Sequence, residues 1–438
     1  MDSTVNPPAS LCLFSISFLI PAINSCSEQM IFNLKAMRRL NPDYSANLRS
    51  IICCAGNNAY FYRIIAENMY IHQLKGWPNF TWNTEALLTR LGEVRHRQGR
   101  ILGLMSSAGF KLQETAVLDT LTLDVTKSSE IEGERLNTEQ VRSSIARRLG
   151  IELAGAVQAD RIVEGVVEMM LDATQKYTDE LTADRLFNWH AALFPTGRSG
   201  MHKITVADWR TPEAGPMQVV SGAMGKEKVH FEAPEAERLP AEMAAFLKWF
   251  NDEPTTDAVL KAAIAHLWFV TIHPFDDGNG RITRAITDMQ LARADGTSQR
   301  FYSMSAQILR EKTAYYNILE QTQKGGLDIT TWLSWFLDCL FHAMEHTEET
   351  LTAVTNRAKF WEKNRDTLLN SRQQYMVSTL LDDFYGTLTS TKWAKMTKSS
   401  PDTALRDIQD LIEKGILEKE PGGGRNTTYN LVTLKQNE

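Results

Sequence analysis

The sequence predicts a mainly α-helical protein that carries one β-hairpin and ends in a small unit of mixed helices and strands. Three observations support this fold class. Apolar residues recur at helical spacing through most of residues 84–345. Short strand-like segments appear between residues 201 and 234. From residue 373 onward, three helical patterns precede two strand-like segments that flank a glycine-rich turn.

The composition is that of a globular protein. The chain has 438 residues, of which 43% are hydrophobic and 23% are charged, and its length allows two to four domains. A net charge of −6 gives no indication of a surface for nucleic acid or anionic membranes. Five cysteines are too few and too badly spaced for a disulfide framework or a zinc site. We therefore expect a cytoplasmic protein with no membrane partner.

Residues 1–68 look unlike the rest of the chain. The apolar run from Leu11 to Ile23 is too short to span a bilayer, and Pro21 interrupts it. It also lacks the positively charged start of a signal peptide. Because a coherent segment begins at Met69, we expect residues 1–68 to be a disordered or mis-assigned extension.

The pattern from residue 84 to residue 149 is helical and amphipathic. Within it, Ser128 and Glu132 are four residues apart and therefore share one helical face. Many helix surfaces contain this spacing by chance, so alone it is a weak indication of function. Glu130 and Glu134 lie on other faces, and we predict that both are exposed to solvent.

Helical patterns continue to residue 200, and His190 on one of them is more simply a packed or capping histidine than a ligand. Residues 217–222 and 229–231 then predict a hairpin around a turn of glycine, lysine and glutamate. The alternative is a structured loop that serves as a connection.

A string of twelve residues from His273 to Arg284, with the sequence HPFDDGNGRITR, lies between two buried helical patterns. Gly278 and Gly280 carry no Cβ, so an anion can approach the backbone N–H groups closely. Arg281 and Arg284 are three residues apart on one helix face, and guanidinium groups suit phosphate oxygens. We place both arginines in the first turn of the second helix.

The same string contains groups for metal binding and proton transfer. A carboxylate beside bound phosphates is the usual way to hold Mg²⁺, and His273 can accept a proton from a hydroxyl near neutral pH. Together these groups describe phosphoryl or nucleotidyl transfer from a nucleoside triphosphate. The plainer alternative is a simple helix–loop–helix connection, where aspartate, glycine and asparagine are ordinary loop residues.

The twelve-residue string resembles the signature of the Fic family, His-Pro-Phe-x-Asp/Glu-Gly-Asn-Gly-Arg-x-x-Arg, and matches it at every fixed position. The resemblance implies a helical core that transfers AMP from ATP to a protein hydroxyl. It assigns His273 as the general base and Asp277 as the Mg²⁺ ligand, and leaves Asp276 without a role. It makes Gly278, Asn279 and Gly280 an anion hole and Arg281 and Arg284 phosphate ligands. Doc-type kinases of this superfamily carry lysine at the position of Gly280, which favours nucleotidyl transfer here.

The resemblance extends to residues outside the string. Ser128, Glu132 and Gly133 resemble the family's inhibitory helix, which implies that Glu132 pairs with Arg284 and occupies the γ-phosphate site. The predicted hairpin corresponds to the family's flap, which would place Val219, Val220, Ser221 and Gly222 over nucleotide and target. Tyr316 is most simply a core aromatic, although the resemblance makes it a wall of the adenine pocket with Gln323 near the base. Family members carry asparagine at the Gln323 position, so this chain departs from the pattern there.

The C-terminal region resembles a winged helix-turn-helix domain. Its helical segments run from Tyr375 to Phe384, from Thr391 to Met396 and from Pro401 to Gly415, and Gly422 to Arg425 would form the wing. DNA binding is the obvious reading. However, the third helix carries Asp402, Asp407, Asp410 and Glu413 against Arg406 and Lys414. Because an acidic helix fits phosphate poorly, we favour a protein contact or a homodimer over DNA.

These observations divide the chain into five parts: residues 1–68, an N-terminal helical region at 69–154, a Fic core at 155–345, a helical linker at 346–372 and the winged-helix unit at 373–438. The expected function is a protein adenylyltransferase that uses ATP and Mg²⁺, modifies a Ser, Thr or Tyr hydroxyl of a protein or of itself, and is inhibited by Glu132. One alternative is a winged-helix transcriptional regulator or nucleotide-dependent scaffold with a Fic core. Another is removal of AMP from a target, which would use the same pocket.

Overall fold

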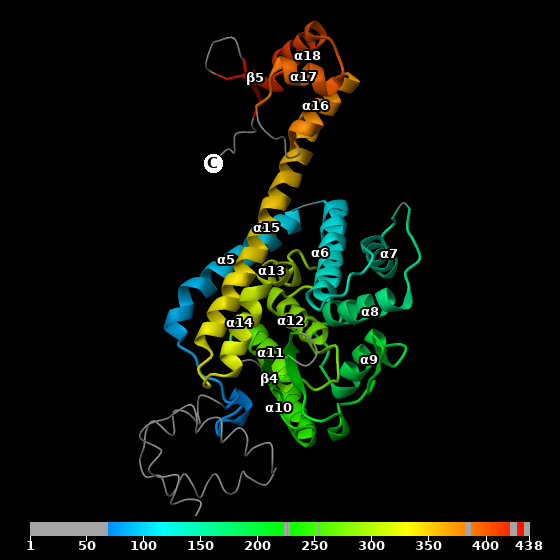
Figure 1. The fold of residues 1–438 in the computed structure, drawn as a ribbon. Coiled ribbons are helices and arrows are strands. Elements are labelled where there is room, and N and C mark those ends of the chain that lie inside the picture. Colours follow the sequence, from blue (N-terminus) through cyan, green and yellow to red (C-terminus); the bar gives the residue numbers. More distant parts are fainter. Residues whose placement is uncertain are drawn as a thin grey trace, which may run out of the picture. The chain divides into compact units, whose positions relative to one another are not determined.

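The computed structural model describes residues 69–432, apart from residues 108, 154, 223–225, 227, 253–254, 382–386 and 421–426. The expectations for residues 1–68 and for the wing at 422–425 therefore lie outside the described residues. The described chain is mainly helical, which confirms the predicted fold class at that level (Figure 1). No helix within this described part is both long and apolar enough to cross a membrane.

The N-terminal region is helical, as its amphipathic pattern predicts. After a short 3-10 helix at Ile71–Gln73 come α5 (Thr84–Ser107), α6 (Phe110–Ile131) and α7 (Thr138–Leu149). The Asn137 side chain caps α7 by accepting a hydrogen bond from the Gln140 N–H at 3.1 Å. One face of these helices enters the main core of the protein, which makes the region part of the same packed body.

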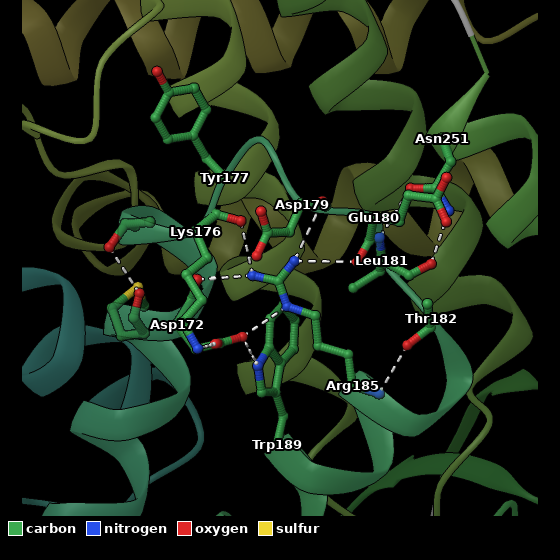
Figure 2. A network of polar contacts seen from close by, with 12 residues as sticks. Asp172, Lys176, Tyr177, Asp179, Glu180, Leu181, Thr182, Arg185, Trp189 and Asn251 are labelled. Carbon is green, nitrogen blue, oxygen red and sulfur yellow. Dashed lines mark hydrogen bonds and ion pairs between the residues drawn. The ribbon is translucent and has the colours of Figure 1, made fainter.

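Helices α8 (Arg161–Gln175) and α9 (Ala183–Leu193) are joined by a turn that a polar network fixes (Figure 2). Arg185 donates to the Asp172 carboxylate at 2.7 Å and to the carbonyl groups of Lys176, Asp179 and Glu180. The Trp189 indole donates to the same carboxylate at 2.8 Å. The network satisfies carbonyl groups at the end of α8 and so fixes the position of α9.

Two antiparallel strand pairs follow α9. The short pair is β1 (Arg198–Ser199) with β2 (His202–Lys203), and the longer pair is β3 (Gln218–Ser221) with β4 (Lys228–Glu232). The longer pair confirms the predicted hairpin. Its register shifts between Val219 and Val220, so that His230 is an extra residue on β4.

The central helix of the main core is α11 (Ala258–Ile272), and it packs against α12 (Asn279–Asp295). Nearly all of its residues are buried, as expected for a helix that is apolar on every side. The Trp332 indole donates to the Ala263 carbonyl at 2.8 Å and ties α15 to this helix. The remaining helices of the core are α10 (Leu239–Asn251), α13 (Met304–Arg310), α14 (Lys312–Gln323) and α15 (Thr330–Lys363).

Helix α15 crosses residue 345, where we placed the end of the core and the start of a helical linker. It runs without interruption through the first part of the predicted linker at 346–372. The change at residue 345 is one of charge, which alters the exposure of side chains but does not end a helix. The sequence from Thr330 to Lys363 contains no glycine or proline that would do so.

The C-terminal unit has a hydrophobic core of its own, which includes Trp393, Ile408 and Leu411. The Ser400 hydroxyl accepts a hydrogen bond from the Thr403 N–H at 3.2 Å and caps the helix that begins with Pro401. The elements follow the predicted order: α16 (Ser371–Leu381), α17 (Ser390–Thr397), α18 (Pro401–Glu413), β5 (Leu417–Lys419) and β6 (Tyr429–Leu431), with β5 and β6 antiparallel.

Candidate functional site

The twelve-residue string forms the connection between the two central helices. His273 caps the end of α11 in the left-handed region, with φ 51°, and Gly278 is the N-cap of α12 with φ 81°. Because α12 begins at Asn279, Arg281 lies in its first turn and Arg284 in its second. Our placement of both arginines in the first turn was therefore wrong for Arg284. Both side chains are nonetheless buried at this end of the helix, each with 2% of its surface exposed.

Arg284 is held by the end of α6. Its Nε donates to Ser128 Oγ at 2.8 Å, and its Nη2 donates to the Ser128 carbonyl at 2.8 Å and to Glu132 Oε1 at 2.7 Å. The four-residue spacing of Ser128 and Glu132 thus brings both residues to one guanidinium. A buried guanidinium with three acceptors is well satisfied, and a ligand that needs it must displace the carboxylate.

Glu132 also lies against the start of α12. A Cβ on Gly280 would lie 2.0 Å from Glu132 Oε1, so any other residue at this position would exclude the carboxylate. The first N–H groups of α12 have no acceptor within the helix, and the helix end carries partial positive charge. The carboxylate therefore occupies a place that suits the oxygens of an anionic ligand.

Arg281 has an acidic partner that the sequence analysis missed. Its Nη1 lies 2.6 Å from Glu134 Oε2, and its guanidinium stacks over the Phe194 ring at 5.1 Å. We predicted that Glu134 faces solvent, and its side chain is indeed 46% exposed, but one of its oxygens faces the string. Glu130 instead bonds Lys127 at 2.8 Å on the same helix. Each arginine of the string therefore pairs with one carboxylate from the segment that ends α6.

His273 is positioned to act as a base. Its Nδ1 lies 3.2 Å from the Val270 carbonyl, which can only accept, so Nδ1 carries the proton and Nε2 keeps its lone pair. Burial lowers the pKa of His273, and the nearby positive charge of Arg210 lowers it further. The imidazole is therefore neutral at neutral pH and able to accept a proton.

Arg210 was not singled out from the sequence. Its side chain is buried, and its Nε donates to the His273 carbonyl at 2.8 Å while its Nη2 donates to the Pro234 carbonyl at 2.5 Å. Its backbone N–H donates to the Pro274 carbonyl at 2.9 Å. Arg210 thus joins the strained turn at His273 to the segment that follows β4.

The two aspartates of the string have different surroundings. Asp276 accepts a hydrogen bond from the Thr205 N–H at 2.8 Å and so supports the loop. Asp277 accepts from the Gly278 N–H at 2.5 Å and from the Ser199 hydroxyl, and its side chain remains 41% exposed. The described residues contain no group of three or more acidic, histidine or cysteine side chains that could hold a metal by themselves. A single accessible carboxylate at the edge of an anion site fits Mg²⁺ that takes its other ligands from phosphate and water.

Two further residues shape the string. Both polar atoms of the Asn279 side chain bond the backbone of Phe275, at 3.0 and 2.8 Å, so this side chain braces the turn. Asn279 can therefore contribute to an anion site through its backbone N–H. The buried ring of His190 stacks on Phe275 at 4.3 Å and contacts the Asp277 carbonyl at 3.2 Å. Burial lowers the pKa of His190 to about 4, in keeping with the packed histidine we predicted.

The remaining predicted site residues lie on the hairpin and on α14. Val220 is 48% exposed, and Ser221 is bonded to His230. Tyr316 is 39% exposed, so the simple prediction of a core aromatic was wrong. The neighbouring Tyr315 fills the core, with 2% exposed, because adjacent helix positions point about 100° apart. Gln323 is buried, and its amide donates to Thr271 Oγ1 at 3.3 Å.

Comparison with known proteins identifies the region that carries the string. Residues 180–291 match the Fic/DOC family, and residues 70–151 match a family described as a domain of unknown function (DUF4172). The chain is 28% identical over 242 residues to the protein adenylyltransferase fic-1 of Caenorhabditis briggsae, covering 52% of this chain and 45% of that protein. It is 25% identical over 232 residues to the protein adenylyltransferase Fic of Drosophila melanogaster, covering 50% and 39% respectively.

The chain therefore contains a Fic/DOC domain and has homologues named as protein adenylyltransferases. It spans less than half the length of the two relatives described above. A crystal structure of a Fic family protein from Desulfovibrio desulfuricans G20 aligns with 81% of this chain and 98% of its own, at 20% identity and a TM-score of 0.47.

Proposed function

We propose that this protein transfers AMP from ATP to a Ser, Thr or Tyr hydroxyl of a protein, including itself. The observation that carries the proposal is the juxtaposition of a neutral His273, with its Nε2 lone pair, and a helix N-terminus served by two buried arginines. His273 Nε2 takes the proton of the acceptor hydroxyl while the hydroxyl oxygen attacks the α-phosphorus of ATP. The bond from that phosphorus to the bridging oxygen breaks, and pyrophosphate leaves. The names of the relatives support transfer of AMP over transfer of phosphate.

Asp277 would hold Mg²⁺ against the phosphates, with water completing the coordination. The ion supplies neutralisation of charge on the phosphate oxygens when it is bound. The Ser199 hydroxyl and the Gly278 N–H fix the orientation of the carboxylate. Arg281 and Arg284 would bind the outer phosphates through their guanidinium groups.

Glu132 would inhibit the enzyme by occupying part of the nucleotide site. Its carboxylate bonds Arg284 and lies against Gly280, where a phosphate oxygen would otherwise bind. A phosphate cannot approach without like-charge repulsion and the loss of a charge-assisted hydrogen bond. In this proposal the Ser128 contacts keep Arg284 in place whether or not Glu132 is present.

The test is incubation of purified protein with Mg²⁺ and α-labelled ATP, followed by measurement of label on protein. We expect weak labelling by wild type, labelling at least about tenfold stronger by Glu132→Gly, and none by Glu132→Gly combined with His273→Ala. Glu130→Gly is the matched control, because it removes a carboxylate that bonds Lys127 instead of Arg284. If Glu132→Gly labels no more strongly than Glu130→Gly, the inhibitory role of Glu132 is refuted. If no variant labels any protein, adenylyl transfer itself is refuted.

The C-terminal unit is, in this proposal, a winged-helix domain for protein contact or for a homodimer. Its order of helices and strands supports the fold. One of the acids on α18 does not contribute to an outer face, because Asp407 is buried against Arg372 at 2.7 Å, and a second acid, Asp410, is paired with Lys414 at 2.5 Å. Part of the negative charge of α18 is therefore buried and does not face a ligand, so the acidic sequence alone does not exclude DNA binding, and a direct test is needed. Fluorescence anisotropy with a labelled DNA duplex at low salt, beside light scattering of the full chain, separates DNA binding from self-association.

A further inference from the structure

The inhibitory segment proposed above lies at the C-terminal end of α6, and a helix leaves its last four carbonyl groups without partners inside the helix. In α6 these carbonyl groups belong to residues 128–131. Each of the four accepts a hydrogen bond. N–H groups of the segment itself serve two of them, and cationic side chains from two other helices serve the remaining two.

The internal donors form a Schellman motif around Gly133. This residue has φ 88°, a conformation that glycine adopts readily, and its N–H donates to the Glu130 carbonyl at 3.1 Å. The N–H of Glu134 donates to the Ser129 carbonyl at 3.0 Å. The motif fixes the backbone on both sides of Glu132, so the position of the Glu132 carboxylate depends on how this helix end is held.

Two cations hold the other carbonyl groups. Arg284 Nη2, from α12, donates to the Ser128 carbonyl at 2.8 Å, and Lys312 Nζ, from α14, donates to the Ile131 carbonyl at 2.6 Å. A cation at this end of a helix also meets the partial negative charge of the helix dipole. The two cations differ in one respect: phosphate would compete for Arg284, whereas the proposed reaction gives Lys312 no role.

The surroundings of Lys312 keep it in place. It is the first residue of α14, and Glu311 before it joins this helix to α13. Glu311 Oε1 accepts a hydrogen bond from Gln307 Nε2 at 2.6 Å and lies 3.1 Å from His342 Nδ1 on α15. Helix α13 packs against both α6 and α14. Lys312 is half-buried, so water replaces its contact with the Ile131 carbonyl less well than at an exposed site.

We propose that Lys312 is a positioning residue of the inhibited state, because its contact with the Ile131 carbonyl holds the segment that carries Glu132 against Arg284. Loss of this contact lets the helix end move, and the Glu132 carboxylate then leaves the phosphate site more often. This inference rests on the proposed inhibition of adenylyl transfer by Glu132, and it adds a residue outside the phosphate site that sets the strength of that inhibition.

Labelling with Mg²⁺ and α-labelled ATP tests the proposal in two backgrounds. In otherwise wild-type protein, Lys312→Met should raise labelling about three- to tenfold, since one charge-assisted contact at the helix end is lost. In the Glu132→Gly background the same substitution should change labelling by less than about twofold, because the carboxylate that Lys312 positions is absent. Labelling in that background also reports whether the Lys312→Met chain folds.

Two further variants serve as controls. Lys127→Met also removes a cation near the end of α6, but the Lys127 ammonium bonds the Glu130 side chain of the same helix at 2.8 Å. Lys312→Arg keeps a cationic donor for the Ile131 carbonyl. Both should label within about twofold of wild type. Hydrogen exchange gives an independent measurement: the N–H groups of residues 133–134 should exchange faster in Lys312→Met than in Lys127→Met.

The possible results separate this inference from the proposed function. If Glu132→Gly labels strongly and Lys312→Met labels no more than Lys127→Met, the inference is overturned and adenylyl transfer stands. An equal gain from Lys312→Met with and without Glu132 would overturn the inference too, because Lys312 would not act through that carboxylate. A loss of labelling in the Glu132→Gly background would likewise overturn it, since Lys312 would then serve the active state. If no variant labels any protein, the proposed function and this inference fail together.

Discussion

Glu134 Oε2 lies 2.6 Å from Arg281 Nη1, so Arg281 is paired with a carboxylate in the same way as Arg284. The two pairs differ in exposure: the Glu134 side chain is 46% exposed and that of Glu132 is 33% exposed. Solvent weakens an ion pair, so Glu134 should oppose nucleotide binding less than Glu132 does. The segment after α6 thus places one stronger and one weaker carboxylate on the candidate phosphate ligands.

We predict that Glu134→Gln raises the affinity for magnesium ATP roughly two- to fivefold, as expected for loss of one exposed pair. Calorimetric titration in the Glu132→Gly background gives the measurement, because the site is then free of the stronger carboxylate. Glu139→Gln, in the exposed first turn of α7, removes the same charge away from Arg281. An equal gain from both variants would point to net charge in place of the specific pair.

Arg210 should determine the position and the protonation of His273. Arg210→Lys cannot reach both the His273 and the Pro234 carbonyl groups through one ammonium, so the imidazole should lose its fixed orientation. In the Glu132→Gly background we expect kcat to fall roughly 10- to 100-fold while KM for ATP changes less than about threefold.

The pH dependence of the rate provides a second test of the role of Arg210. Burial is the main cause of the lowered pKa of His273, and Arg210 lowers it further by its charge. Arg210→Met should therefore shift the acidic limb of the rate profile to higher pH. The control is Arg238→Lys, at an arginine whose guanidinium bonds Glu242. Profiles that coincide for Arg210→Met and the parent would assign Arg210 a merely structural role.

The chemistry of the site could be predicted where it is local in sequence. The string holds its base, metal ligand and arginines within twelve residues, and helical spacing pairs Ser128 with Glu132. Ser199 and Arg210 were not predicted as site residues. Ser199 contacts Asp277 across 78 residues of sequence, and Arg210 contacts His273 across 63. No periodicity marks such contacts, since they depend on how loops fold over the core. Tyr315 lies in the core where we expected Tyr316, and the cause is different. The two residues are adjacent on one helix, and a local sequence pattern does not determine well which of two adjacent positions faces the core.

Buried acids beside the site should make stability depend on pH. Asp124 lies one turn before Ser128, and Asp288 one turn after Arg284. Burial raises the pKa of Asp124 well above its usual value, with the charge of Asp288 adding to the effect. Burial likewise raises the pKa of Asp288 to about 6, although Arg300 bonds it at 3.0 Å. The folded protein therefore binds protons that the unfolded chain has released between about pH 4 and pH 6.

It follows that these groups stabilise the folded state at low pH and lose that contribution as pH rises through their folded pKa values. Asp124→Asn stays neutral, so the free energy of unfolding of the variant minus that of wild type should increase from pH 4.5 to pH 7. One proton limits the slope to about 1.4 kcal/mol per pH unit. Urea unfolding at each pH measures this difference in the free energy of unfolding. Asp119→Asn, at an exposed position on α6, is the control. A difference that is constant across this range would show that Asp124 is already ionised in the folded protein and that its pKa is not raised.

The crossing of α8 and α9 should tolerate no side chain at Gly165. A Cβ there would lie 1.8 Å from the Ala192 carbonyl oxygen and 2.6 Å from its carbon, and a helix backbone cannot give way locally as a side chain can. Gly165→Ala must therefore push α9 away from α8, which moves His190 and its contact with the Asp277 carbonyl. We expect a loss of at least about 2 kcal/mol in the free energy of unfolding. Gly99→Ala offers the matched comparison, because Gly99 lies inside α5 with nothing within 4 Å of the added Cβ. That variant should gain up to about 1 kcal/mol from higher helix propensity. If urea unfolding showed no loss of stability in Gly165→Ala, propensity would outweigh packing at this crossing, and the close contact of α8 with α9 would not be what fixes α9 beside the string.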